Sequence, residues 1–203
     1  MKWYELVGAA AAIEGVSWLQ RMHQRRVLYA KARAISRARG RPFLVVGKPF
    51  GWDAGRDAGP MVPWSRCGAH PCADGGAPSL GDPEGDVTLD IRGVPECKDG
   101  MAGDITDLHM FPDGHFGAVF ISCTLEHVDD IESAWRELHR VSMRPGEKPA
   151  VFVVRPQVWS WFAHFEPSHQ WVISESKGGV LRARRRKGAK KKIKMLVNKP
   201  TPV

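Results

Sequence analysis

The sequence has no long apolar segment free of charge, and it has few cysteines. No stretch reaches the roughly 18 uncharged apolar residues that a clear membrane span needs. Only four cysteines occur in 203 residues, and the chain shows no convincing secretory signal. This pattern argues against a disulfide-stapled secreted scaffold and predicts reduced thiols in a cytoplasmic protein. The length suits one domain with a real core, plus tails.

Acidic residues are absent from two segments near the ends of the chain. Residues 15–52 contain nine basic residues and no acidic one, and residues 182–194 contain nine more basic residues. Residues 53–181 hold ten basic and twenty acidic residues, a net charge of −10. The formal net charge of +8 therefore hides an acidic body between basic ends. We expect residues 21–41 and 182–194 either to be solvated or to contact polyanions weakly, such as nucleic acid or an anionic membrane.

Residues 1–41 are predicted to be a helical region, apolar first and then basic. The apolar segment 3–19 indicates a helix packed on the domain or a partner, or else an attachment to a membrane surface. Glu14, near the middle of this segment, would cost roughly 2.5–3.5 kcal/mol in lipid. A basic helix then continues to Gly40, which is placed to end it. The predicted apolar stripe of this second part is Val27, Leu28, Lys31, Ala34, Ile35 and Ala38.

Four short apolar runs, each bounded by turn residues, are typical of strands buried on both faces. After the third run the apolar period becomes helical, with acidic residues first and basic residues later, an order that suits the helix dipole. Arg144-Pro145-Gly146 ends that helix before the fourth run. The sequence therefore predicts a strand–helix–strand unit with a parallel sheet. The expected strands are 43–47, 86–91, 116–123 and 150–154, and the expected helix is 129–142.

A series of motifs surrounds this unit: Gly103-Asp104, Phe111-Pro112-Asp113, Leu125-Glu126-His127, Arg140-Val141 and Pro145-Gly146. In this spacing the stretch resembles the class I S-adenosylmethionine-dependent methyltransferase domain of the small-molecule "type 11" sort. The resemblance implies an α/β fold with a doubly wound, mostly parallel, Rossmann-like sheet in the strand order 3-2-1-4-5. It places the domain at residues 42–181, with a shortened C-terminus. Residues 182–203 then form a basic tail that we expect to be disordered.

The resemblance also implies S-adenosylmethionine as cofactor and assigns residues to it. Asp90 matches the acid that accepts hydrogen bonds from the ribose hydroxyls, and Asp104 matches the acid that receives the adenine amino group. An alternative for both acids is the capping of loops at strand ends. Ile91, Ile105 and Leu125 are expected to flank the cofactor, together with Gly47 and Gly51 of the first loop.

The first loop and the segment after it depart from the family pattern. Residues 47–51 read Gly-Lys-Pro-Phe-Gly, so that Lys48 adds a cation and Pro49 removes an amide donor. Residues 51–85 show no helical period, although the family has a helix there. This segment contains Cys67, His70 and Cys72, which lack a nearby fourth ligand. We therefore expect free thiols and no metal site.

The region after the fourth strand is rich in aromatic residues. They could form a lid or an acceptor pocket, although core packing is the simpler expectation. Residues 170–174 and 180–184 are predicted to form a hairpin. The aromatic residues are Trp159, Trp161, Phe162, Phe165 and Trp171.

Two functions fit these features. The first is methyl transfer from S-adenosylmethionine to a small-molecule or glycan-like acceptor, with His127 as candidate base at the carboxyl end of a central strand. The alternative for His127 is a structural pairing with Glu126 or a backbone group. The second function is a non-catalytic, methyltransferase-like binding or scaffold module, attached through its basic ends to a membrane, nucleic acid or an assembly.

Overall fold

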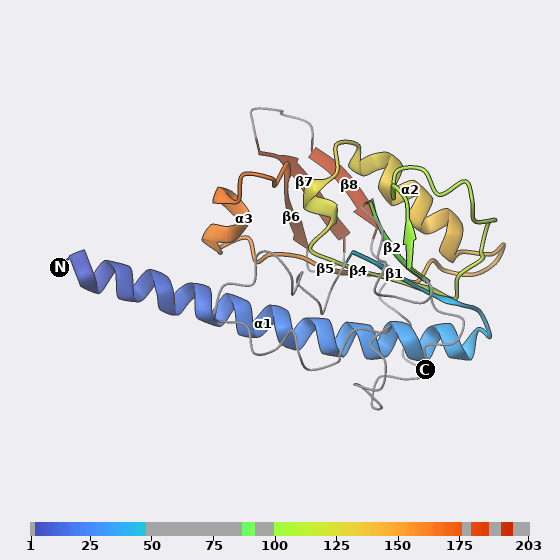
Figure 1. Ribbon diagram of the computed structural model, residues 1–203, viewed down its shortest axis with the longest axis horizontal. Helices are drawn as coiled ribbons and strands as arrows, with labels where there is room; N and C mark the ends of the chain where they lie inside the picture. Colours follow the sequence, from blue (N-terminus) through green and yellow to red (C-terminus); the bar gives the residue numbers. More distant parts are fainter. Residues whose placement is uncertain (1–2, 48–86, 92–99, 176–179, 187–191, 197–203) are drawn as a thin grey trace.

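The computed structural model describes residues 3–47, 87–91, 100–175, 180–186 and 192–196. Within these residues a five-stranded, all-parallel sheet has the order β3-β2-β1-β4-β5 (Figure 1). The predicted α/β fold and the strand order are confirmed, and the four predicted strands lie within two residues of their expected bounds. The strands are β1 (Phe43–Val46), β2 (Val87–Asp90), β3 (Gly100–Ala102), β4 (Ala118–Ser122) and β5 (Val151–Val154).

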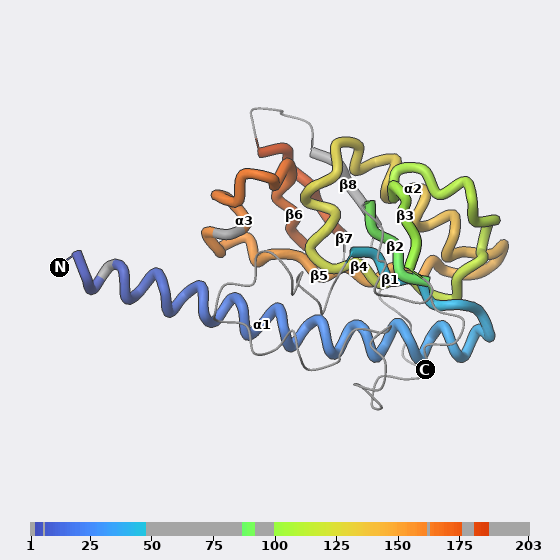
Figure 2. Tube along the Cα trace, in the orientation of Figure 1, coloured from blue at the N-terminus to red at the C-terminus, as the bar shows by residue number. Residues whose placement is uncertain are grey.

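Strand β3 was not located from the sequence. It has only three residues, Gly-Met-Ala, none of which is fully buried, so it lacks the apolar run that marks the other strands. Figure 2 shows β3 beside β2, at the edge of the sheet. Pairing with β2, and not local preference, therefore makes this segment extended.

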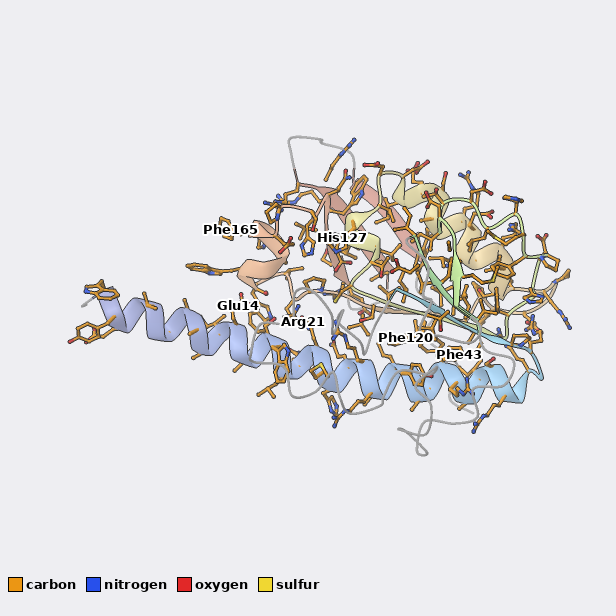
Figure 3. All side chains as sticks on the ribbon, in the orientation of Figure 1. Glu14, Arg21, Phe43, Phe120, His127 and Phe165 are labelled. Atoms are coloured by element: carbon orange, nitrogen blue, oxygen red, sulfur yellow. The ribbon has the colours of Figure 1, made fainter. Side chains whose placement is uncertain are left out.

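One helix, α1 (Trp3–Ala38), runs through the N-terminal region expected to be helical and covers one face of the sheet. Tyr29 packs edge-on against Phe43 and Phe120, with ring centroids 5.2 and 5.4 Å apart (Figure 3). The helix comes so close that a Cβ added at Gly117 would lie 2.7 Å from Cα of Ser36. Small residues at this crossing thus allow the aromatic cluster to be buried.

The predicted apolar stripe of α1 is right for Leu28 and Ile35, which pack against the core, and wrong for its other four residues. Val27 is 49% exposed, and Lys31, Ala34 and Ala38 are also exposed. The face that packs on the sheet is instead Tyr29, Ala32, Arg33 and Ser36. Burial of the large Tyr29 ring sets the rotation of the helix, and small or polar residues fill the space around it.

The N-terminal part of α1 extends beyond the body of the protein (Figure 1). Its attachment point is Glu14, which accepts hydrogen bonds from Ser160 Oγ, at 2.8 Å, and from the backbone amide of Trp161. The acid at the centre of the apolar segment therefore caps the short helix α3 (Trp161–Phe165). Among the described residues, no helix is long and apolar enough to cross a membrane.

The other face of the sheet is covered by α2 (Ile131–Ser142), as predicted, and by a separate antiparallel sheet (Figure 1). Asp130 caps α2 by accepting from the amides of Glu132 and Ser133. The apolar face of α2 then packs into the main core beside β4. The antiparallel strands are β6 (Trp171–Glu175), β7 (Val180–Arg185) and β8 (Lys192–Leu196), in that order.

This second sheet confirms the predicted hairpin and corrects the predicted tail. Residues 182–185 and 192–196, expected to be disordered, are strand residues. Strand β7 alternates, because Leu181 and Ala183 are buried whereas Arg182 and Arg184 are exposed. The two apolar side chains, which lie on the same face of β7, pack into the core and hold the strand there.

Core packing was the wrong expectation for most of the aromatic residues near α3. Trp159, Trp161 and Phe165 are exposed, by 45%, 59% and 71% (Figure 3 shows Phe165). Trp171 is buried as expected, and its indole Nε1 donates to the carbonyl of Val128 at 2.7 Å.

Candidate functional site

A cavity of about 310 Å³ lies at the carboxyl ends of the parallel strands. Its volume is at the lower end of the roughly 300–1,000 Å³ usual for ligand sites. The strand order reverses between β1 and β4, and open α/β sheets bind ligands at such a point. The lining comes from the ends of β1, β2 and β4 and from the loop after β3. It consists of residues 46–47, 89–91, 103–106, 124 and 127–130.

Gly47 leaves the cavity open at the end of β1. Its φ of 77° lies in the left-handed region, which favours glycine. A Cβ at this position would lie 2.5 Å from Thr124 Oγ1, which belongs to the loop after β4. The amide of Gly47 donates to the carbonyl of Leu89 at 2.8 Å and so continues the β1–β2 pairing to the rim. The close approach thus requires a glycine here, at the position that the resemblance expects to be the first glycine of the loop.

Asp90 and Ile91 line the cavity at the end of β2. The carbonyl of Asp90 accepts from the amide of Gly103 at 3.1 Å, which joins the loop after β3 to the end of β2. Ile91 is largely exposed at the mouth of the cavity. Both residues lie where the resemblance expects ribose contacts, and their role in cofactor binding remains a prediction.

Asp104 and Ile105 also line the cavity. Oδ1 of Asp104 accepts from the amide of Thr106 at 2.8 Å, so one oxygen caps its own turn, as the alternative interpretation expected. Ile105 is buried and belongs to both the cavity wall and the core. An adenine contact through Asp104 would therefore use a carboxylate that the turn already orients.

One predicted cofactor residue does not line the cavity, and a second is outside the described part of the chain. Leu125 has no exposed surface and packs in the core, so it does not line the cavity. Gly51 lies outside the described residues, as do Cys67, His70 and Cys72.

Acidic side chains dominate the polar lining of the cavity. Asp90, Asp104, Asp129 and Asp130 line it, and no lysine or arginine does so among the residues that the structure describes. Hydrogen bonds from Ser133 lower the pKa of Asp130, which keeps this carboxylate ionised. A cavity of this charge favours a cationic ligand. The sequence predicts Asp129 and Asp130 only as acidic residues at the start of a helix. In the fold, both residues line the cavity just before α2.

The loop beside the cavity is held by one arginine. Arg140 on α2 donates to the carbonyl of Phe111 at 2.9 Å and to Asp113 Oδ1 at 2.8 Å. It also donates to the carbonyl of Leu108 at 2.9 Å. The Phe-Pro-Asp turn and the Arg-Val pair therefore belong to one structural unit, which fixes the path of residues 103–113 at the cavity.

His127 lines the cavity from a short 3-10 turn, η2 (Leu125–His127), after β4 (Figure 3). Burial lowers the pKa of His127, and backbone hydrogen bonds with Ser168 and Cys123 partly offset this effect. The ring is therefore neutral near pH 7 and able to take a proton. No hydrogen bond joins it to Glu126 among the described contacts; its ring packs edge-on against His169, with centroids 4.7 Å apart.

Glu126 lies directly behind this histidine and is 2% exposed. Burial raises its pKa to about 7, against smaller opposing contributions from Arg25 and Arg21 on α1. Arg25 itself donates to Ser122 Oγ at 2.8 Å. The carboxyl end of β4 is thus linked to α1 by charge as well as by packing.

Residues 91–147 match the family model described as a methyltransferase domain. No curated protein and no solved structure matches the chain. The matched stretch contains the loop after β3, β4, η2 and α2, and thereby most of the cavity lining.

Proposed function

We propose, from the premise that this chain contains a class I S-adenosylmethionine-dependent methyltransferase domain, that it methylates a small-molecule or glycan-like acceptor. Members of this family use S-adenosylmethionine as methyl donor. We infer a small-molecule or glycan-like acceptor because the sequence resembles the small-molecule branch of these methyltransferases.

The observation that carries the proposal is the acidic cavity at the switch point of the sheet. S-adenosylmethionine supplies a methyl group that its sulfonium centre already activates, so the protein must mainly bind, align and exclude water. The four aspartates of the lining suit the positive charge of that ligand. In this assignment Asp90 accepts from the ribose hydroxyls and Asp104 from the adenine amino group.

His127 is the proposed base for a hydroxyl or amine acceptor. It borders the cavity, and its lowered pKa leaves it neutral near pH 7. As the acceptor attacks the methyl carbon and the carbon–sulfur bond breaks, the ring nitrogen takes the acceptor proton. A base in this position is needed only when the acceptor carries a proton to lose.

The first test is calorimetry of the full chain with S-adenosylmethionine and S-adenosylhomocysteine. We expect binding of both, followed by release of S-adenosylhomocysteine when hydroxylated small molecules or sugars are supplied. Absence of binding by the folded protein would remove the enzyme assignment. Binding without turnover on any acceptor class would leave the cofactor site in place and remove the proposed acceptor.

A second candidate function is binding of a polyanion, and one observation favours it. The register pairs Arg182 with Lys194 and Arg184 with Lys192, so positions of like charge lie opposite each other in β7 and β8. Both arginines are exposed. A strand pair of this kind offers a folded basic surface to an external anion.

The other basic segment, residues 21–41, contributes less to such a surface. Arg39 donates to the carbonyls of Gly117 and Lys148, both at 2.8 Å, and Arg41 donates to Gly114 and to Glu147. These arginines hold loops of the body and are not available to a partner. We therefore assign polyanion contact mainly to residues 182–194.

Retention on heparin at rising salt tests this assignment. Replacing Arg182 and Arg184 by Gln should lower the salt concentration needed for elution, because a protein that makes fewer contacts with heparin releases fewer counterions on binding. The matched control replaces Arg26 and Arg37, two exposed arginines of α1, by Gln. Equal loss in both variants would mean that net charge alone governs retention.

A further inference from the structure

Three side chains with metal-binding atoms meet behind the cavity. They are Glu126 and His127 of η2 and His169, which lies just before β6. Their ligand atoms all lie within 4.8 Å of one another. The contact depends on the fold, because β6 packs beside η2 and the amide of Gln170 donates to the carbonyl of Glu126 at 2.7 Å. No sequence motif predicts this cluster, since His169 is far from the Leu-Glu-His motif along the chain.

Glu126 gives the independent evidence that this cluster binds something. The residue is 2% exposed, yet neither carboxylate oxygen has a hydrogen-bonding partner of normal geometry among the described residues. A buried carboxyl without hydrogen-bonding partners loses its hydration and gains no protein contact in exchange. One of its oxygens lies within 4.8 Å of a ring nitrogen of each of the two imidazoles, where a cation would compensate that loss.

The distances and the donor set suit a divalent ion of the zinc class. Two donors that each lie about 2.1 Å from one ion are at most about 4.2 Å apart, so small side-chain rotations would close the cluster. Two imidazoles and one carboxylate are a ligand set known for Zn²⁺ and for Fe²⁺, and they leave coordination positions open.

Nearby arginines restrict which ion could bind. The positive charges of Arg21 and Arg25 act on the carboxylate of Glu126. Arg155 also interacts electrostatically with this carboxylate. Their positive charge weakens binding of every cation. Ions held mainly by charge, such as Mg²⁺, lose most from this, whereas ions that bind imidazole strongly keep an advantage.

We propose that Glu126, His127 and His169 form a three-ligand binding site for a divalent transition-metal ion such as Zn²⁺. The site borders the cavity through His127. Its open positions could take an oxygen of the methyl acceptor, with His127 then acting as ligand in place of base. This role, unlike the site itself, rests on the proposed methyl transfer.

The test is metal binding by the full chain without cofactor. The protein is stripped with a chelator and titrated with Zn²⁺, and Co²⁺ is added separately as a spectroscopic probe. To limit thiol ligation, Cys67, Cys72 and Cys97 are replaced by Ser in the starting chain, so that Cys123 is the one thiol left. We expect one ion per chain and a visible Co²⁺ spectrum without the near-ultraviolet band of thiolate ligation.

Matched substitutions locate the ion. Glu126→Gln, His127→Gln and His169→Gln should each weaken Zn²⁺ binding at least about tenfold, the smallest loss usual when a metal environment is altered. Glu166→Gln removes a nearby acid that is not a ligand, and His109→Gln removes an exposed histidine; both should bind Zn²⁺ as the starting chain does. Equal affinity in all five variants, or no ion in the folded starting chain, would overturn the proposal.

A measurement on the unsubstituted protein guards against variants that do not fold. Diethyl pyrocarbonate modifies accessible imidazoles, and mass spectrometry locates the products. Zn²⁺ should protect His127 while His109 stays reactive, and unprotected His127 at saturating Zn²⁺ would refute the site. If a chelator abolishes methyl transfer but leaves the affinity for S-adenosylhomocysteine unchanged, the result would support a role of the metal ion in binding the acceptor. If methyl transfer is unchanged, that role is removed but the metal site is not.

Discussion

Replacing Gly47 by Ala should destabilise the protein through two separable effects. The first is backbone strain, since an L-residue with a side chain at φ 77° costs about 1–2 kcal/mol. The second is a clash, because the new Cβ would lie 2.5 Å from Thr124 Oγ1, and overpacking of this kind costs about 1–3 kcal/mol. The sum, about 2–5 kcal/mol, is a large part of the 5–15 kcal/mol typical of a folded domain.

The two effects separate in the double variant with Thr124→Ala. Without Oγ1, the nearest remaining atom beyond Thr124 itself is the carbonyl oxygen of Ser122 at 3.8 Å, an ordinary contact. Thr124→Ala alone loses only the hydrogen bond from Oγ1 to that carbonyl, at 3.1 Å and worth about 0.5–1.5 kcal/mol. Gly47→Ala should therefore cost about 1–3 kcal/mol less in the Thr124→Ala background than alone.

Urea unfolding of the four proteins measures this coupling free energy, and calorimetry with S-adenosylhomocysteine shows whether the cavity narrows. Gly47→Ala should weaken cofactor binding, and the double variant should regain part of it. Strictly additive unfolding free energies would refute the described contact between the end of β1 and the loop after β4.

Three further predictions concern the cofactor, the core and the acid limb of stability. Asp90→Ala should weaken S-adenosylmethionine binding by about 1–3 kcal/mol, and Asp104→Ala by less, because its loss concerns one hydrogen bond; unchanged calorimetric affinity for Asp90→Ala would remove the ribose assignment. Phe120→Ala should cost about 3–5 kcal/mol in urea unfolding, whereas Phe165→Ala, at an exposed position, should cost under about 0.5 kcal/mol; similar losses would contradict the placement of α1. Burial lowers the pKa of His139 to about 4, so the folded state loses stability as pH falls from 6.5 toward 4. His139→Phe should remove that loss, about 1–3 kcal/mol after allowance for partial exposure, in unfolding compared at about pH 7.5 and about pH 4.5.

The parts of the fold that could be predicted from sequence are those set by local patterns. Strand β4 has five buried residues in a row, and α2 has an N-cap, an apolar face and a Pro-Gly stop. Their identity follows from side chains that are neighbours in the chain. The cavity also follows in large part, because the residues after β1, β2 and β4 must meet at one edge of a parallel sheet.

The parts that could not be predicted depend on distant contacts. The buried face of α1 is decided by Phe43 and Phe120, which no helical period within α1 can reveal. His169 reaches His127 only because β6 packs beside η2. Strand β7 is predicted from residues 180–184 as the second strand of a hairpin, whereas β8 lies in the basic segment expected to be disordered and is a strand because it pairs with β7.

The placement of α1 has a consequence for synthesis on the ribosome. The helix is made well before its partners on β4 and β5, and Ser160, which holds Glu14, follows Glu14 by 146 residues. At roughly 5–20 residues per second, Glu14 waits on the order of 7–30 s for that partner. During this interval the ring of Tyr29 and the small residues around it have no sheet to cover them. A nascent chain of this protein should therefore depend on a chaperone that shields α1 until β5 has left the exit tunnel.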